Sequence, residues 1–281
     1  MMKQKLLVLL TVSLLPASFA AQTRSTRPSQ PASMQEIIRR FAASESRNKI
    51  ARNNYTFTQN FDLRTIGMGG QVTGDYHRVS DIVYDDRGER VEKITYFPSP
   101  TLKDLQVTPE DMQDLAGVEP FALTLEDLPK YEVNYVGKER LDELNTYVFE
   151  VAPIKMVRGQ RYFKGRIWVD DEDLQVVKAA GQSVPEIKEQ RFPRFESYRE
   201  NIDGKYWFPT YVYADDDLDF DRGSIHIRMV VRYTNYKKFS TNIRVIDGNG
   251  EAAPDQDTGQ DKAAKPRTAQ PQKPDPKRPP Q

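Results

Sequence analysis

The two histidines of this 281-residue chain are the first residues to consider for catalysis or metal binding. His77 and His226 both fall in predicted strands, beside Arg78 and Arg228. A catalytic or metal-binding pair would require the two rings to meet in space, and histidines on the solvent face of a strand are commoner. We therefore predict no catalytic histidine.

Other residue patterns that carry chemistry are missing from the sequence. The chain has no cysteine, which excludes cysteine nucleophiles, zinc–thiolate sites and disulfides. It contains no Gly-x-Ser-x-Gly elbow, His-Glu-x-x-His pair, glycine-rich phosphate loop or EF-hand loop. The sequence thus predicts a protein that is not an enzyme, with no catalytic residue, no metal and no cofactor.

Carboxylates gather in two places, residues 170–173 and residues 215–221. Either cluster could offer oxygen ligands to a cation. The first lies between two predicted strands and lacks the glycine of a calcium loop, so we interpret it as a turn in which aspartates bond their own backbone. We interpret the second as a solvated strand edge, where clustered charge blocks unwanted pairing.

The elements that would position these residues are mostly strands. Alternating apolar and polar residues, separated by turn signals, predict strands over 55–61, 72–84, 90–97, 131–136, 146–152, 162–169, 174–180, 195–201, 206–214 and 224–236. The clearest hairpin runs over 161–183. Short connections favour an antiparallel meander that curls on itself. The predicted fold is mainly β (α+β), an incomplete antiparallel β-barrel of about 10–11 strands with an N-terminal helix and a helical lid insertion.

An amphipathic helix is predicted before the first strand. Ser33 is the expected N-cap, and Glu36 completes a capping box. The helix should end near Arg52. Such a helix can lie on a membrane or pack on a sheet, and we favour packing. Its expected apolar stripe is Ile37, Ile38, Phe41, Ala42 and Ile50, and its expected polar face carries Arg39, Arg40, Glu45 and Arg47.

Residues 101–129 form the expected helical insertion. Thr108 caps a helix that has Pro109 at its first position, and a second short turn follows. One side of the insertion is apolar, which makes it a candidate lid or plug. The predicted lid residues are Met112, Leu115, Leu125 and Leu128.

Composition divides the chain into four parts. Residues 1–20 have the charged start, short apolar run and small residues of a cleavable signal peptide, which predicts export to the periplasm and no transmembrane segment in the mature chain. We expect a flexible lead over 21–32, one folded domain over 33–245, and a disordered Pro/Lys-rich tail over 246–281. The tail is interpreted as an inert solubilising segment, with a polyproline ligand as the alternative. A net charge of zero argues against nucleic acid.

The hairpin around Tyr162-Phe163-Lys164-Gly165-Arg166-Ile167-Trp168-Val169-Asp170, continuing to residue 178, resembles one that is frequent in the LolA/LolB-like superfamily. The signal peptide, capped helix, long meander and helical insertion are also similar to this group, which includes outer-membrane lipoprotein-sorting proteins and RseB-like periplasmic half-barrels. The resemblance implies a LolA-like half-barrel domain whose helices cover an apolar cavity that accepts acyl chains. No binding residue can be transferred from the family.

Two hypotheses of function follow. The first is a periplasmic, non-enzymatic carrier or binding protein for acylated or hydrophobic ligands, including outer-membrane lipoprotein sorting, because each buried methylene contributes about 0.8 kcal/mol. The alternative is an envelope protein-interaction or stress-sensing module without lipid cargo. Expected partners are a lipid or acylated protein and other envelope proteins, and the chain is expected to be a monomer. The predicted apolar-face residues, some from the core and some from the cavity, are Tyr55, Phe57, Phe61, Tyr147, Phe149, Phe163, Ile167, Phe208, Ile227 and Met229.

Overall fold

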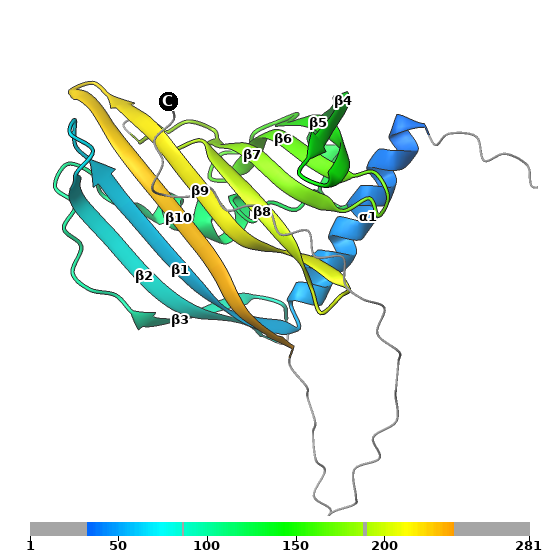
Figure 1. Cartoon of the computed structure of the whole chain (residues 1–281), viewed down its shortest axis with the longest axis horizontal. Helices are drawn as coiled ribbons and strands as arrows, with labels where there is room; N and C mark the ends of the chain where they lie inside the picture. The colour runs from blue at the N-terminus through cyan, green and yellow to red at the C-terminus, as the bar shows by residue number, and fades with distance from the viewer. Residues whose placement is uncertain (1–32, 86, 188–189, 239–281) are drawn as a thin grey trace, which may run out of the picture. The chain divides into compact units, whose positions relative to one another are not determined.

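The computed structural model describes residues 33–85, 87–187 and 190–238 (Figure 1). The predicted signal peptide, flexible lead and C-terminal tail lie outside these residues. Among the helices that are described, none is long and apolar enough to cross a membrane.

One antiparallel sheet of ten strands makes up most of the described chain. Its spatial order is β3-β2-β1-β10-β9-β8-β7-β6-β5-β4, and the end strands β3 and β4 do not pair with each other. The predicted mainly-β, incompletely closed sheet is therefore confirmed. The strands are β1 (Tyr55–Ile66), β2 (Val72–Tyr84), β3 (Arg90–Tyr96), β4 (Tyr131–Leu141), β5 (Leu144–Pro153), β6 (Tyr162–Asp170), β7 (Val176–Val184), β8 (Phe195–Ile202), β9 (Tyr206–Phe220) and β10 (Gly223–Lys238).

Two meanders form this sheet, β1 to β3 and β4 to β10. They join where β1 pairs with β10, with Phe61 opposite Val231. The segment that connects the two meanders contains the predicted insertion, in which α2 (Pro109–Gln113), η1 (Asp114–Val118) and η2 (Leu128–Lys130) follow each other. The first and last strands of the domain are therefore neighbours in the middle of the sheet.

The N-terminal helix α1 (Met34–Arg52) packs on the sheet, beside the β4–β9 half (Figure 1). The Ser33 hydroxyl accepts a hydrogen bond from the Glu36 amide at 3.2 Å, as the sequence predicts. The Phe41 ring contacts Phe149 on β5, with 5.3 Å between ring centroids. Packing thus orients α1, because its apolar stripe is covered by the sheet.

Two assignments on α1 are wrong. Ile50, expected to extend the apolar stripe, is 67% exposed. Glu45, expected on the polar face, is fully buried. The reason is the helical period, since the stripe that passes through Phe41 continues at positions four and seven residues later, which places Glu45 and Asn48 against the sheet.

The β6–β7 hairpin is built as predicted, with the acidic residues in its turn. The Asp170 carboxylate accepts a hydrogen bond from the Asp173 amide at 2.9 Å. Leu174, expected to start the second strand, instead has φ 51 and belongs to the turn, so β7 begins at Val176. Within the hairpin, Gly165 lies opposite Gly181.

Candidate functional site

An apolar cavity of about 370 Å³ lies between the sheet and the two irregular segments around residues 104–108 and 190–195. Its walls come from β1, β7, β8, β9 and β10, from the insertion and from those segments, and ten of its twenty lining residues are aliphatic, aromatic or methionine. We call it the apolar cavity. Its apolar lining residues are Phe61, Leu63, Leu105, Val107, Phe192, Phe195, Leu218, Phe220, Ile227 and Met229.

A buried carboxyl group, Glu119, also lines the apolar cavity. It is 6% exposed, and its Oε2 has no hydrogen-bond partner among the described residues. Burial, together with the nearby carboxylates of Asp114 and Asp111, raises the pKa of Glu119 to about 8. Glu119 is therefore protonated at neutral pH and presents a neutral hydrogen-bond donor to the cavity.

The insertion is fixed to the sheet by a buried ion pair. Arg161 donates to both carboxylate oxygens of Asp114, from Nε at 2.9 Å and from Nη2 at 2.8 Å. Each side chain is 6% exposed. The Phe121 ring stacks on Phe163 of β6, with centroids 4.4 Å apart. Opening the insertion as a lid would break these contacts.

A second buried ion pair joins α1, β8 and the insertion. Arg199 donates from Nη1 to Glu45 Oε1 at 2.7 Å and to Oε2 at 2.6 Å, and from Nη2 to the Phe121 carbonyl. Both side chains are almost completely buried. The pair therefore ties α1 to the segment that covers the cavities.

The predicted lid residues occupy different environments. Leu115 is buried, and its carbonyl accepts a hydrogen bond from Gln59. Met112 is half-buried, with its sulfur 2.8 Å from Arg78 Nη1. Leu128 is half-buried, and Leu125 is 46% exposed although its amide donates to Ser46 on α1. Their role as a lid stays a prediction.

A second cavity, of about 580 Å³, lies on the other side of α2 and η1. Asp111 and Asp114 line the apolar cavity, whereas Gln113 and Gly117 line the second, so the insertion forms a wall between them. We call the second the basic cavity because its charged lining residues are Lys49, Arg52, Arg90, Lys130, Arg161 and Asp127.

The ten residues predicted for the apolar face divide into three groups. Phe61, Ile227 and Met229 line the apolar cavity, and Phe163 lines the basic cavity. Tyr147 is half-buried beside Tyr135, with Lys138 Nζ 4.7 Å from its ring centroid. The remaining five are buried: Tyr55, Phe57, Phe149, Ile167 and Phe208. Ligand contact by any of the ten stays a prediction.

Seven apolar residues of the cavity were not predicted from the sequence. Leu105, Val107 and Phe192 lie outside regular strands, where no periodicity marks a buried face. Leu218 and Phe220 did carry a signal, because they alternate with Asp217 and Asp219 inside the acidic run. Leu63 continues the alternation of β1 beyond its predicted end, and Phe195 is the first residue of β8.

The acidic run forms an open strand edge inside the sheet, which agrees with its interpretation as a solvated strand edge. It belongs to β9, which pairs with β10 along this stretch, whereas its ladder with β8 stops at Tyr213. The open side is met by Arg194, whose Nη2 lies 3.0 Å from Asp216 Oδ1. The arginine side chain thus balances part of the negative charge of the run.

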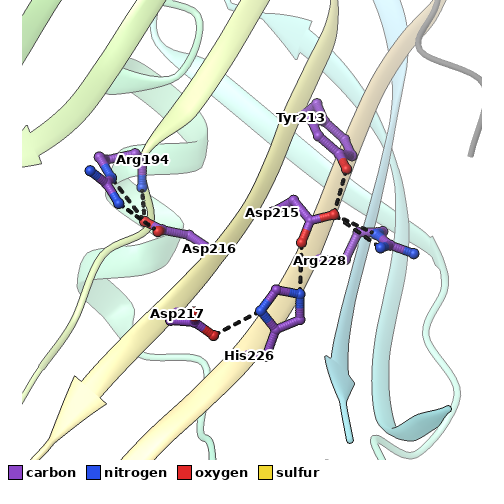
Figure 2. A network of polar contacts seen from close by, with 7 residues as sticks. All are labelled: Arg194, Tyr213, Asp215, Asp216, Asp217, His226 and Arg228. Carbon is purple, nitrogen blue, oxygen red and sulfur yellow. Dashed lines mark hydrogen bonds and ion pairs between the residues drawn. The ribbon is translucent and has the colours of Figure 1, made fainter. Parts of the chain in front are cut away.

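The two histidines have separate partners. His226 contacts Asp217 through Nδ1 and Asp215 through Nε2, each at 2.8 Å (Figure 2). His77 Nε2 lies 3.2 Å from Asn60 Oδ1. Asp215 is partly buried, but hydrogen bonds from Tyr213 and Arg228 lower its pKa. Within the described residues, no group of three or more His, Asp or Glu side chains could hold a metal ion.

Comparison with known proteins returned matches only among solved structures, since no family model and no curated protein matches. The chain is similar to a LolA superfamily protein from Nitrosomonas europaea, with 18% identity, TM-score 0.33, and coverage of 70% of this chain and 94% of that chain. It is similar to a DUF1329 family protein from Desulfovibrio piger, with 15% identity, TM-score 0.35, and coverage of 70% and 90%. A lipoprotein-sorting protein domain from Vibrio parahaemolyticus shows 11% identity, TM-score 0.33, and coverage of 70% and 92%.

Two of these three proteins, by their descriptions, belong to the group that the hairpin sequence resembles. The identities and TM-scores of these matches are too low to support a conclusion about function. The functional proposal is therefore based on the cavities of this chain.

Proposed function

We propose that the chain is a periplasmic, non-enzymatic binding protein or carrier whose apolar cavity takes an acyl chain or a similarly hydrophobic ligand. The observation that carries the proposal is the apolar cavity itself, about 370 Å³ lined by ten apolar side chains. Ligand pockets in proteins range over roughly 300–1,000 Å³ and have mostly apolar walls with few polar groups. Sorting of acylated lipoproteins is one activity of this class.

The energetics suit a chain of methylenes. Burying about ten of them would contribute roughly 8 kcal/mol, at about 0.8 kcal/mol each, before the costs of association are subtracted. A net free energy of this size would correspond to a dissociation constant of about 1 µM, and the costs of association weaken the affinity from that limit. Longer acyl chains, or a hydrogen bond from neutral Glu119 to an ester or amide carbonyl, would offset part of these costs.

The acidic groups at the cavity favour the uncharged part of a ligand. Asp104, Asp111, Asp114 and Arg191 line it together with Glu119, and Asp114 is paired with Arg161. A fatty-acid carboxylate placed beside Asp104 and Asp111 would be repelled. The ligand's acyl portion is therefore the part that we assign to the apolar cavity.

Replacing Val107 by tryptophan tests the assignment. Val107 is half-buried in an irregular segment that lines the cavity, so the larger side chain can fill the space without disturbing a strand. Leu102→Trp is the matched control, since Leu102 is half-buried in the same segment but does not line the cavity. Binding of a fluorescent acyl probe to the mature protein should weaken at least about tenfold in V107W and stay unchanged in L102W.

Equal binding by V107W and the wild type would contradict the cavity assignment. The alternative of a protein-interaction module without lipid cargo predicts a different result, because the wild type itself would then show no saturable binding of the probe.

A further inference from the structure

The basic cavity carries more positive charge than its surroundings neutralise. Arg161 is paired with Asp114 in the wall, and Arg90 Nη1 lies 2.8 Å from Glu92 Oε2. Lys130 and Lys49 share one carboxylate, Asp127, at 2.7 Å and 3.7 Å. Glu92 also pairs with Arg78 at 2.8 Å, outside the lining. With Glu92 assigned to Arg90, the lining residues, Arg52 included, keep a surplus of two positive charges.

Arg52 is the cation without a partner. Its Nε is shielded from solvent and has no hydrogen-bond partner, and no ion pair reaches its guanidinium from the described residues. Its place in the last turn of α1 favours a positive charge there. The helix end provides no hydrogen-bond acceptor for the Nε–H of Arg52, however, and it is energetically costly to leave a charged group without a partner. A buried donor of this kind points to an anion that occupies the cavity.

We propose that the basic cavity binds the phosphate group of a phosphate monoester, with Arg52 as its principal ligand and Lys49 as a second. A phosphate monoester carries about −1.5 to −2 charge at neutral pH, which matches the surplus, whereas a carboxylate would balance half of it. The planar guanidinium can donate two parallel hydrogen bonds to phosphate oxygens. Lys49, with half of its side chain exposed, stands where the cavity reaches solvent.

This inference does not rest on the proposed function, since inorganic phosphate needs no acyl chain to bind. The two cavities share the wall formed by α2 and η1, so one amphiphile with a phosphate head and an acyl tail could use both. The shared chemistry is the phosphate group, and its source is either a free phosphate ester or a phosphate-headed lipid.

Calorimetric titration of the mature protein with glycerol phosphate and with inorganic phosphate, at low salt, tests the site. Arg52→Gln should weaken binding at least about tenfold, because it removes charge-assisted hydrogen bonds. Lys49→Gln should weaken it severalfold, and it preserves the test if R52Q fails to fold, since Lys49 is exposed. Arg47→Gln is the control, because Arg47 is exposed on the same helix and does not line the cavity. Thermal melting of each variant verifies its fold.

The source is identified with a short-chain phosphatidic acid. If it binds more tightly than glycerol phosphate, and V107W removes the difference, the site takes a lipid head; if both bind equally, it takes a free phosphate ester. Either result supports the site. The proposal is overturned if the wild type shows no saturable binding of phosphate or its esters, or if R52Q and K49Q bind as well as R47Q.

Discussion

Glu119→Gln should remove a large pH dependence from the stability of this protein. Burial and the carboxylates of Asp114 and Asp111 raise the pKa of Glu119 from 4.5 to about 8. A folded-state pKa above the unfolded value means that the contribution of Glu119 is fully present below pH 4.5 and is lost as the pH rises through 8. At about 1.4 kcal/mol per unit, the wild type should lose about 4 kcal/mol relative to E119Q between pH 5 and pH 8.

The assay is urea unfolding at pH 5, 6.5 and 8, followed by the fluorescence of Trp168 and Trp207. The quantity to compare is the difference in unfolding free energy between E119Q and the wild type, which cancels the other titrating groups. Glu126→Gln is the matched control, because Glu126 is an exposed glutamate of the same insertion, and its difference should stay flat. A difference for E119Q that varies by less than about 1 kcal/mol across this range would refute the reasoning, and would mean that water or a bound group solvates the carboxylate.

Two further predictions concern stability. Arg199→Met should lower the free energy of unfolding by about 3–5 kcal/mol in urea, because it leaves Glu45 buried without its partner. Adding Glu45→Leu to the same chain should recover part of this loss. A double variant that is no more stable than R199M would argue against the pair. Gly181→Val should cost about 1–3 kcal/mol, because a Cβ there would lie 2.3 Å from the Lys164 carbonyl oxygen. Gly137→Val, where a Cβ meets nothing within 4 Å, is its control, and an equal loss in both would show that close packing at Gly181 is not the cause.

Local patterns predicted the strands well because each strand and turn is specified by residues next to each other. The Asp170 turn is an example, since its side chain bonds the backbone three residues later. The capping box of Thr108 and Asp111 is another, and both of its reciprocal hydrogen bonds are present. Every strand starts within two residues of its predicted start, including the strand for which Leu174 was the expected start, but β1, β4 and β9 extend five or six residues beyond their predicted ends.

The cavities were harder to predict because they depend on which part of the sheet a distant segment covers. Alternation identifies the inner faces of β1 and β10, but it does not distinguish Ile227 on β10, beside a cavity, from Tyr55 on β1, which packs with Ala51 of α1. Buried charges are harder still. Glu45 looks like a surface glutamate until Arg199, from the other end of the domain, is placed against it.

The pairing of β1 with β10 also bears on how the chain acquires its fold. The two meanders can each form from neighbouring strands, but the ladder that unites them needs the first and last strands together. Such long-range pairing raises contact order and slows folding. A nascent chain that lacks β10 has two unjoined half-sheets, so the sheet can be completed only after the last strand, Gly223–Lys238, has been synthesised.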